Sequence, residues 1–220
     1  AHPMIEETVD DLARQGIKNI VALVLAPHFS SYSIGQYVGR AQTAAEPHGI
    51  SVVGINSWAT EPAFIDFLAT DMAAKKAALP ARTRVLFTAH SLPQRIIDGG
   101  DPYPQELHAT ATAVANKLGL VEGDDWAIAW QSAGRTPEPW IGPDILDVID
   151  TIAANKQADG VLVSACGFVA DHLEVLYDLD IEAKHRSDHH GLQFDRTTCV
   201  NDDAVVMAAL AQRVITAAQS

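Results

Sequence analysis

Short apolar runs that alternate with helix-like stretches constrain the fold of this chain more than any other feature. The first run, residues 19–26, is unbroken and predicts a strand buried on both faces, as in a parallel sheet. Repeated strand–helix–strand units joined by short polar segments predict an α/β fold with doubly wound parallel sheets flanked by helices. The further strands are expected at 50–55, 84–88, 126–130 and 160–165, and the helices at 34–45, 63–78, 104–118, 143–154 and 204–217.

The loops that follow these strands carry most of the polar and aromatic side chains that could do chemistry. In parallel sheets, ligands bind outside the carboxyl ends of the strands. Histidines, hydroxyl groups and tryptophans should therefore gather at one rim, in loops at 26–33, 56–58, 89–93, 131–135 and 166–172.

Charge and composition exclude several classes of protein. With 15 Lys and Arg against 28 Asp and Glu, the formal net charge of −13 disfavours binding to nucleic acid or to anionic lipid. No apolar run is long enough to span a membrane. Two cysteines make no disulfide framework and favour a reducing, cytoplasmic setting. Glycine-rich phosphate loops and a G-x-S-x-G nucleophile elbow are absent, which removes the usual nucleotide and hydrolase functions of such sheets.

His90 is the first candidate for chemistry. The strand at 84–88 delivers it to the rim of the sheet, and Pro93 fixes a turn directly after it. A histidine there can accept a proton near neutral pH or bind a divalent metal. The alternative is a capping or core histidine.

The second candidate is an acidic stripe formed by Glu174, Asp178 and Glu182. Spaced at i, i+4 and i+8 on a helix, these carboxylates share one face at ~6 Å steps, where they repel one another. A solvated acidic surface is the simplest explanation. The residues between them are nearly all apolar, however, which argues against a helix built for solvent and favours a site for divalent cations.

Three other features are expected to be structural. Cys166 should be a buried strand-end residue, and His28 a buried histidine hydrogen-bonded within its own loop. His185, His189 and His190 resemble a metal site, but the charged residues beside them predict an exposed polar loop.

Six sequence blocks stand out along the chain: LAPHFSSYS at 25–33, AHSLP at 89–93, GDPY at 100–103, WQS at 130–132, PWIGPD at 139–144 and GFVADHLEVLYD at 167–178. Together, and in this order, they resemble the signature blocks of the ferrochelatase family. Residues 26–30 and 170–178 look most like the coproporphyrin ferrochelatases of Gram-positive-type bacteria.

The resemblance implies roles for particular residues. His90 and Glu174 would face each other across a porphyrin, bind ferrous iron and accept the pyrrole protons. Asp178 and Glu182 would hold or relay a hydrated metal ion, and a second divalent cation on this stripe is an added expectation. Tyr37 would touch a porphyrin carboxylate, and Trp130 would line the cleft. Cys166 stands where the family more often has proline.

The resemblance also implies two Rossmann-like, chelatase-type lobes: a partial first lobe of residues 1–56 plus 195–220, and a second lobe of residues 57–194. Family members carry further strand–helix units before the position that matches Ala1. The first lobe is therefore expected to be incomplete, and the chain alone to be poorly stable and nearly inactive.

The implied function is insertion of Fe²⁺ into a porphyrin, most simply coproporphyrin III, in haem biosynthesis. The enzyme needs no cofactor, since iron is a substrate, and it is expected to be a cytoplasmic monomer that binds neither nucleic acid nor a membrane. Two alternatives stay open at this stage. One is a metal- or tetrapyrrole-binding module without turnover, and the other is a cobaltochelatase-like enzyme, although those chains show a histidine pair where this one has His90 and Glu174.

Overall fold

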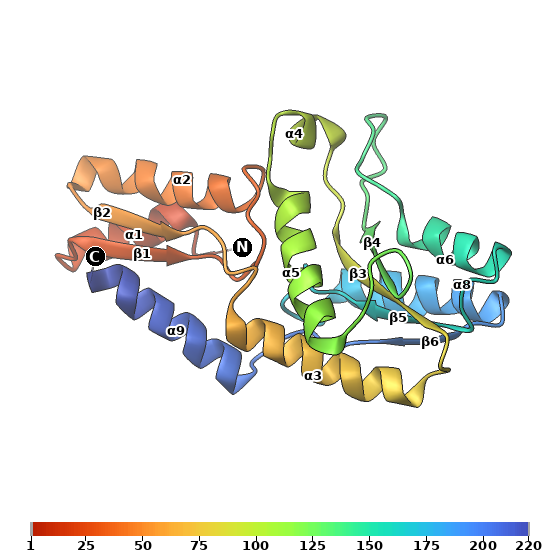
Figure 1. Cartoon of the computed structure of the whole chain (residues 1–220). Helices are drawn as coiled ribbons and strands as arrows, with labels where there is room; N and C mark the ends of the chain where they lie inside the picture. Colours follow the sequence, from red (N-terminus) through yellow and green to blue (C-terminus); the bar gives the residue numbers. More distant parts are fainter. Residues whose placement is uncertain (1, 220) are drawn as a thin grey trace.

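The computed structural model describes residues 2–219, which form an elongated α/β molecule with two separate parallel sheets (Figure 1). Within residues 2–219, no helix is long and apolar enough to cross a membrane. The elements in chain order are α1 (Ile5–Arg14), β1 (Asn19–Leu23), α2 (Ile34–Ala45), the 3₁₀-helix η1 (Glu46–His48), β2 (Ser51–Ile55), α3 (Pro62–Ala78), β3 (Thr83–His90), α4 (Gln94–Asp98), α5 (Tyr103–Leu118), β4 (Trp126–Gln131), α6 (Ile145–Ala154), β5 (Gly160–Ser164), α7 (Leu173–Val175), the π-helix η2 (Leu176–Ala183), α8 (Lys184–His189), β6 (Gln193–Arg196) and α9 (Ala204–Gln219).

The larger sheet has the strand order β4-β3-β5-β6, and all its strands are parallel. The chain leaves β3 for β4 on one side and later returns to β5 on the other side. The strand order therefore reverses at β3, where α/β sheets bind their ligands. β3 ends at His90, which pairs in register with Gln131 at the end of β4.

Both faces of this sheet are covered by helices, and its two central strands, β3 and β5, are buried. Along β3, Val85 and Phe87 pack into the core beneath α3 and α5, whereas Leu86 packs on the opposite face with α6 and η2. This alternation follows from the two-residue period of a strand, because each face has a helical layer to fill. All three side chains are fully buried.

The smaller sheet contains only β1 and β2, which pair in parallel and contact α2 and α9 (Figure 1). Its compact core is small: Val9, Ala45 and Ile50 are its buried members. The prediction that residues 19–26 form a strand buried on both faces is wrong in two respects. The strand ends at Leu23, and its residues are half-buried or exposed, because among residues 2–219 β1 has a single strand neighbour.

Loops and α9 join the two sheets. The indole of Trp58 donates a hydrogen bond to the Val24 carbonyl at 3.1 Å. Arg213 of α9 binds the Glu61 carboxylate at 3.2 Å and the Ser57 carbonyl at 3.0 Å. Helix α9 thus spans from the small sheet to α3. The division into lobes at 1–56 plus 195–220 and 57–194 stays a prediction.

The predicted helices and strands otherwise appear within about two residues of their expected ends, and β6 was not predicted. The expected polar loop around His185 is wrong in conformation, since His185 and His189 lie on α8 and His190 caps it, although all three are exposed. Helix α8 is packed against α6 and β6, and Ser187 is the residue it buries.

Candidate active site

The candidate site lies at the carboxyl ends of β3 and β4, beside the segment that leads from β5 into α7 and η2. His90 ends β3, and Gln131 ends β4. Glu174, Asp178 and Glu182 come from the helical segment that begins at Leu173. Because these residues all lie near the carboxyl ends of parallel strands, residues separated by up to 92 positions in the sequence meet here.

His90 is held in a defined tautomer. Its Nδ1 lies 2.5 Å from the carbonyl oxygen of Ser91, and a carbonyl can only accept a hydrogen bond. Nδ1 therefore carries the hydrogen, and in the neutral ring the lone pair is on Nε2. Nε2 lies 3.9 Å from Oε2 of Glu174, too far for a direct hydrogen bond. Nε2 thus lies close to the Glu174 carboxylate without a hydrogen bond to it.

The segment after β5 brings Glu174 to His90 through a close backbone approach. A Cβ on Gly167 would lie 2.3 Å from Cβ of Ala89, so only glycine lets this loop pass against β3. Phe168 then lies with its ring centroid 6.3 Å from that of His90. His172 caps the helix, its Nδ1 accepting from the Glu174 amide at 3.2 Å. The backbone at Glu174 is fixed by these contacts, while its side chain is half exposed.

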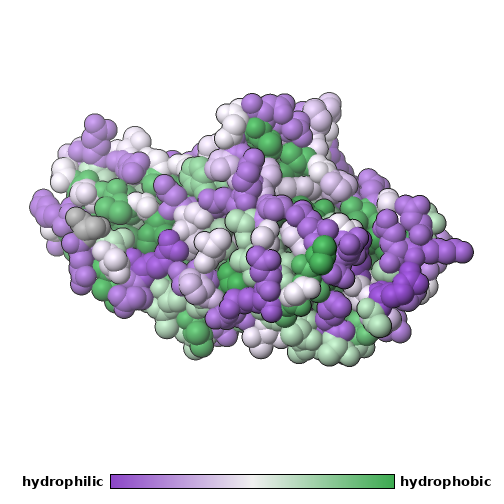
Figure 2. All heavy atoms as spheres, in the orientation of Figure 1, coloured by the Kyte–Doolittle hydropathy of each residue, from purple (hydrophilic) through white to green (hydrophobic). Residues whose placement is uncertain are grey.

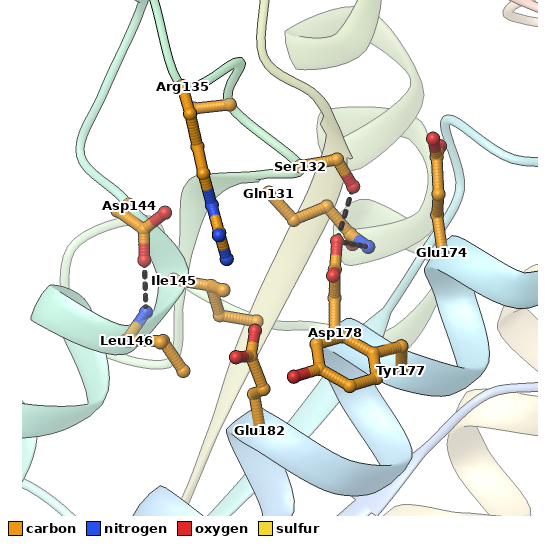
Figure 3. Close-up of a pocket in the computed structure, with 11 residues that line it drawn as sticks. Gln131, Ser132, Arg135, Asp144, Ile145, Leu146, Glu174, Tyr177, Asp178 and Glu182 are labelled. Atoms are coloured by element: carbon orange, nitrogen blue, oxygen red, sulfur yellow. Dashed lines mark hydrogen bonds between the residues drawn. The ribbon is translucent and has the colours of Figure 1, made fainter.

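A cavity of about 380 Å³ opens beside this pair (Figure 3). All three carboxylates of the predicted stripe line it, together with Asp144 and Arg135 from the segment between β4 and α6. Figure 3 shows Glu174, Asp178 and Glu182 following one another along the helix and pointing to the same side. Half-buried like charges at this density repel one another, so the cavity favours cations.

Asp178 is the most firmly positioned of these carboxylates. It accepts hydrogen bonds from Ser132 Oγ and from Gln131 Nε2, the latter at 3.4 Å. Gln131 is itself buried and oriented by Thr88, whose hydroxyl donates to its Oε1 at 2.8 Å. Ser132 adopts a positive φ of 59°, a conformation that non-glycine residues seldom take and that is frequent at functional sites.

Asp144 has a raised pKa, chiefly because burial disfavours its charged form. It caps α6, and its Oδ1 accepts from the Leu146 amide at 2.8 Å, which partly opposes the shift. The charges of Asp147 and Asp178 add to the rise. This carboxylate therefore holds its proton more strongly than an exposed aspartate does.

The helix that carries the stripe differs from the sequence prediction in two ways. Its central part, η2, is a π-helix and not an α-helix, a conformation that is rare and is concentrated at functional sites. Its apolar residues are also less buried than expected: Leu173 is 78 % exposed and Ile181 57 %, while Val175, Leu179 and Ala183 supply the buried face. The apolar character of this segment therefore does not exclude a solvent-facing helix. What marks these carboxylates as a candidate site is that all three line the same cavity.

The candidate metal ligands do not surround a single point. Among residues 2–219, no three Asp, Glu, His or Cys side chains converge closely enough to enclose an ion. His90 with Glu174 forms one position, and Asp178 and Glu182 lie farther along the cavity. The candidate ligands are therefore arranged in a row along the cavity and not around one centre.

The other predicted site residues lie elsewhere. Tyr37 is on α2 beside the small sheet, with 46 % of its surface exposed. Trp130 is buried against Tyr103, at 5.7 Å between ring centroids, and lines a separate groove with His108 and Pro143. The roles expected for both residues stay predictions.

His28 and Cys166 are buried as predicted. His28 bonds to Thr110 of α5 at 2.8 Å, so the prediction of a bond within its own loop is wrong. Burial lowers the pKa of His28 to about 3 and raises that of Cys166 to about 12. Neither side chain lines the cavity.

Several residues near the site were not singled out from the sequence, although Trp140 and Asp144 lie in a block that was noted. The Trp140 ring centroid lies 6.3 Å from that of His90. Gly134 is needed beneath it, since a Cβ there would lie 2.3 Å from the indole. Arg135 lies in the loop 131–135 that was expected at this rim, whereas no local pattern predicts the path that brings Asp144 to the cavity. The prolines around Trp140, which fix a turn, were the available signal.

Comparison with known proteins agrees with this geometry, because residues 1–218 match the ferrochelatase family. The chain belongs to that family. A ferrochelatase from Herpetosiphon aurantiacus is 44 % identical over 208 residues, covering 92 % of this chain and 67 % of that protein. Coproporphyrin III ferrochelatases from Geobacillus kaustophilus and Oceanobacillus iheyensis are 41 % and 40 % identical, covering 97 % and 100 % of this chain and 68 % and 70 % of theirs.

Solved structures extend the likeness to the fold. The sirohydrochlorin chelatase SirB from Bacillus subtilis subspecies spizizenii, in complex with cobalt, aligns with a TM-score of 0.67 at 11 % identity, covering all of this chain and 77 % of that one. SirB from Bacillus subtilis with Fe³⁺ aligns with a TM-score of 0.65 at 15 % identity, covering 99 % and 79 %. At these identities the likeness shows a shared Rossmann-like chelatase fold. The expected α/β fold with parallel sheets flanked by helices is therefore confirmed.

Proposed function

We propose that this ferrochelatase-family chain inserts Fe²⁺ into coproporphyrin III, with His90 and Glu174 as its catalytic residues. The observation that carries the proposal is the free lone pair on Nε2 of His90, which faces the Glu174 carboxylate across 3.9 Å. Relatives of this chain that are named coproporphyrin III ferrochelatases support the choice of porphyrin.

The separation of these two groups suits metal transfer. Nitrogen and oxygen ligands bind divalent first-row metals at about 2.1 Å, so one ion can touch both groups when they are up to about 4.2 Å apart. An ion held in this way keeps open positions toward a porphyrin that lies over His90. The half-exposed Glu174 side chain can move with the ion, because only its backbone is fixed.

Metal insertion must also remove protons. Fe²⁺ replaces the two pyrrole N–H hydrogens of the porphyrin, so each turnover forms the iron–porphyrin bonds and releases two protons. The Nε2 lone pair of His90 can accept one of them, and the Glu174 carboxylate can accept the other. The Nδ1 hydrogen bond to Ser91 remains in place when His90 becomes doubly protonated, since both ring nitrogens are then donors.

The acidic cavity gives this site a supply of metal. In the proposed scheme Asp178 and Glu182 hold the hydrated ion before it reaches Glu174, and Asp178 is kept in position by Ser132 and Gln131. Hard oxygen ligands in a row allow an ion to exchange its water stepwise. We further propose that Tyr37 and Trp130 contribute to porphyrin binding.

The chain is also proposed to act as a monomer in the cytoplasm. Cys166 and Cys199 are free and buried, which is compatible with a reducing compartment. Sedimentation equilibrium at micromolar concentration would show a single species near 23.6 kDa, and a stable dimer would contradict this part of the proposal.

The function is tested by anaerobic incubation of the chain, and in parallel of the chain preceded by the first strand–helix units of a ferrochelatase relative, with Fe²⁺ and either coproporphyrin III or protoporphyrin IX. The expected result is faster iron insertion into coproporphyrin III, with two protons released for each iron, measured by porphyrin absorbance and a pH indicator. Porphyrin binding without insertion would instead favour the non-catalytic binding module. Insertion of cobalt into an open corrin precursor, with no iron insertion, would favour the cobaltochelatase alternative.

A further inference from the structure

Arg135 stands apart from the other arginines of residues 2–219, because it alone forms no hydrogen bond or ion pair. Each of the others binds a carboxylate or a backbone carbonyl. In a chain with 28 acidic residues, an arginine without a partner is unexpected. The lack of a partner for Arg135 is even more unexpected because four carboxylates line the same cavity.

Two of the four carboxylates around Arg135 already have other partners. Figure 3 shows the side chain descending from the loop into the cavity, with its guanidinium between Asp144 and Glu182. Asp144 is engaged as the cap of α6, and Asp178 is engaged by Ser132 and Gln131. The guanidinium thus shares the field of these carboxylates without being fixed to any of them.

An unfixed cation inside an acidic cavity competes with any other cation for the same field. Arg135 lowers the repulsion among the carboxylates when no metal ion is present, and it opposes a divalent ion that enters. A porphyrin carboxylate is a poorer partner for this guanidinium, since the four acidic groups repel it.

We propose that Arg135 is a displaceable internal cation that sets how strongly the acidic cavity takes up a divalent metal ion. The inference rests on the proposed function and names a residue that regulates its metal supply. Arg135 does not bind the ion, and it acts through charge. When the ion enters, the long side chain of Arg135, which is already exposed, moves away from the carboxylates into solvent.

Metal binding measured without porphyrin tests the proposal. Mn²⁺ suits carboxylate ligands and can be followed by electron paramagnetic resonance, so its dissociation constant can be compared for the native chain and for Arg135→Gln, Arg135→Lys and Lys76→Gln. Lys76 on α3 is the matched control, because it has no hydrogen bond or ion pair and lies outside the cavity. The readout does not depend on turnover, so it separates failure of this inference from failure of the proposed function.

Arg135→Gln is expected to bind Mn²⁺ about three- to ten-fold more tightly than the native chain at low salt, which is the size of a screened interaction between a single and a double charge. Arg135→Lys should stay within about two-fold of the native value, since it keeps the charge. Lys76→Gln should not differ from the native chain. The gain in Arg135→Gln should shrink at about 0.5 M NaCl because salt screens the interaction.

Three outcomes would overturn the inference. Unchanged or weaker Mn²⁺ binding in Arg135→Gln would show that the guanidinium does not oppose the ion. An equal gain in Lys76→Gln would assign the effect to net charge. Absence of Mn²⁺ binding by all four proteins up to millimolar concentration would show that the cavity is not a cation site.

Discussion

The two sheets of this molecule are built from similar apolar strands but differ in how completely they are covered. β3 and β5 have strand neighbours on both sides and helices on both faces, and their apolar side chains are fully buried. β1 has one neighbour, and its residues stay half-buried or exposed. The candidate catalytic pair lies wholly on the larger unit. An apolar strand sequence is therefore not enough for burial. How deeply its side chains are buried depends on the strands and helices that lie beside it.

The largest expected effect is a loss of iron insertion without a loss of folding in the larger unit. His90→Ala should reduce iron insertion by at least about 100-fold, because a general base typically contributes 10² to 10⁴ in rate. Circular dichroism should show an unchanged fold, since His90 is partly exposed at a strand end. The matched control is His185→Ala, an exposed histidine on α8 outside the cavity. More than about 10 % residual activity in His90→Ala would make His90 a structural residue.

The second prediction tests the difference between the two sheets by making the same substitution, Leu→Ala, in a strand of each. Leu162→Ala in β5 should lower the free energy of unfolding by about 3–5 kcal/mol, because it leaves a cavity in a fully packed core. Leu23→Ala in β1 should cost about 1–2 kcal/mol, since that side chain is only partly buried. Urea denaturation of both variants measures the difference. Equal losses would mean that both units unfold with the same dependence on packing.

The third prediction concerns the joint between the two units, where His28 is fully buried against α5. The Thr110 hydroxyl donates its hydrogen to the Ala59 carbonyl, so Nε2 of His28 must donate to Thr110, and Nδ1 has no partner. Burial lowers the pKa of His28 to about 3.

Because the folded pKa lies below the unfolded value near 6.5, this contribution to stability is fully present above pH 6.5 and is lost as pH falls toward 3. Between pH 7 and pH 5 the native chain should lose about 2 kcal/mol from this group. His28→Gln should lose correspondingly less over the same range, measured by urea denaturation at the two pH values. An identical pH dependence in native and variant chains would show that His28 is not the group responsible.

The last prediction concerns the acidic stripe, where Glu174 is expected to act differently from Asp178 and Glu182, whose effects are the smallest. Glu174→Gln should lower the maximal rate strongly, because this carboxylate faces His90. Asp178→Asn and Glu182→Gln should mainly raise the iron concentration needed for half-maximal rate, by about three- to ten-fold, since they only supply the ion. Initial rates over a range of Fe²⁺ concentrations distinguish the two patterns. The same effect at all three positions would indicate a general acidic surface.

Much of this architecture could be predicted because buried strands and helices leave a local pattern of apolar residues in the sequence. The apolar run at 84–88 that forms most of β3 also places His90 at the rim, because ligands bind at the carboxyl ends of parallel strands. The half-exposed state of β1 could not be predicted, since it depends on which strands lie beside it. Asp144 reaches the cavity from the far end of a long segment after β4, and a spacing of four residues does not distinguish an α-helix from the π-helix of η2.

The π-helix also makes the length of the segment between Glu174 and α8 a constraint of its own. If Leu176–Ala183 took ordinary α-helical bonding at the same residue count, the segment would wind more tightly and turn everything after it relative to Glu174. Glu182 would then leave the cavity, while Ala183 would no longer face the core. Related sequences should therefore accept many substitutions at the exposed position 181, and loss of one residue between positions 174 and 183 should go together with α-helical bonding in this segment.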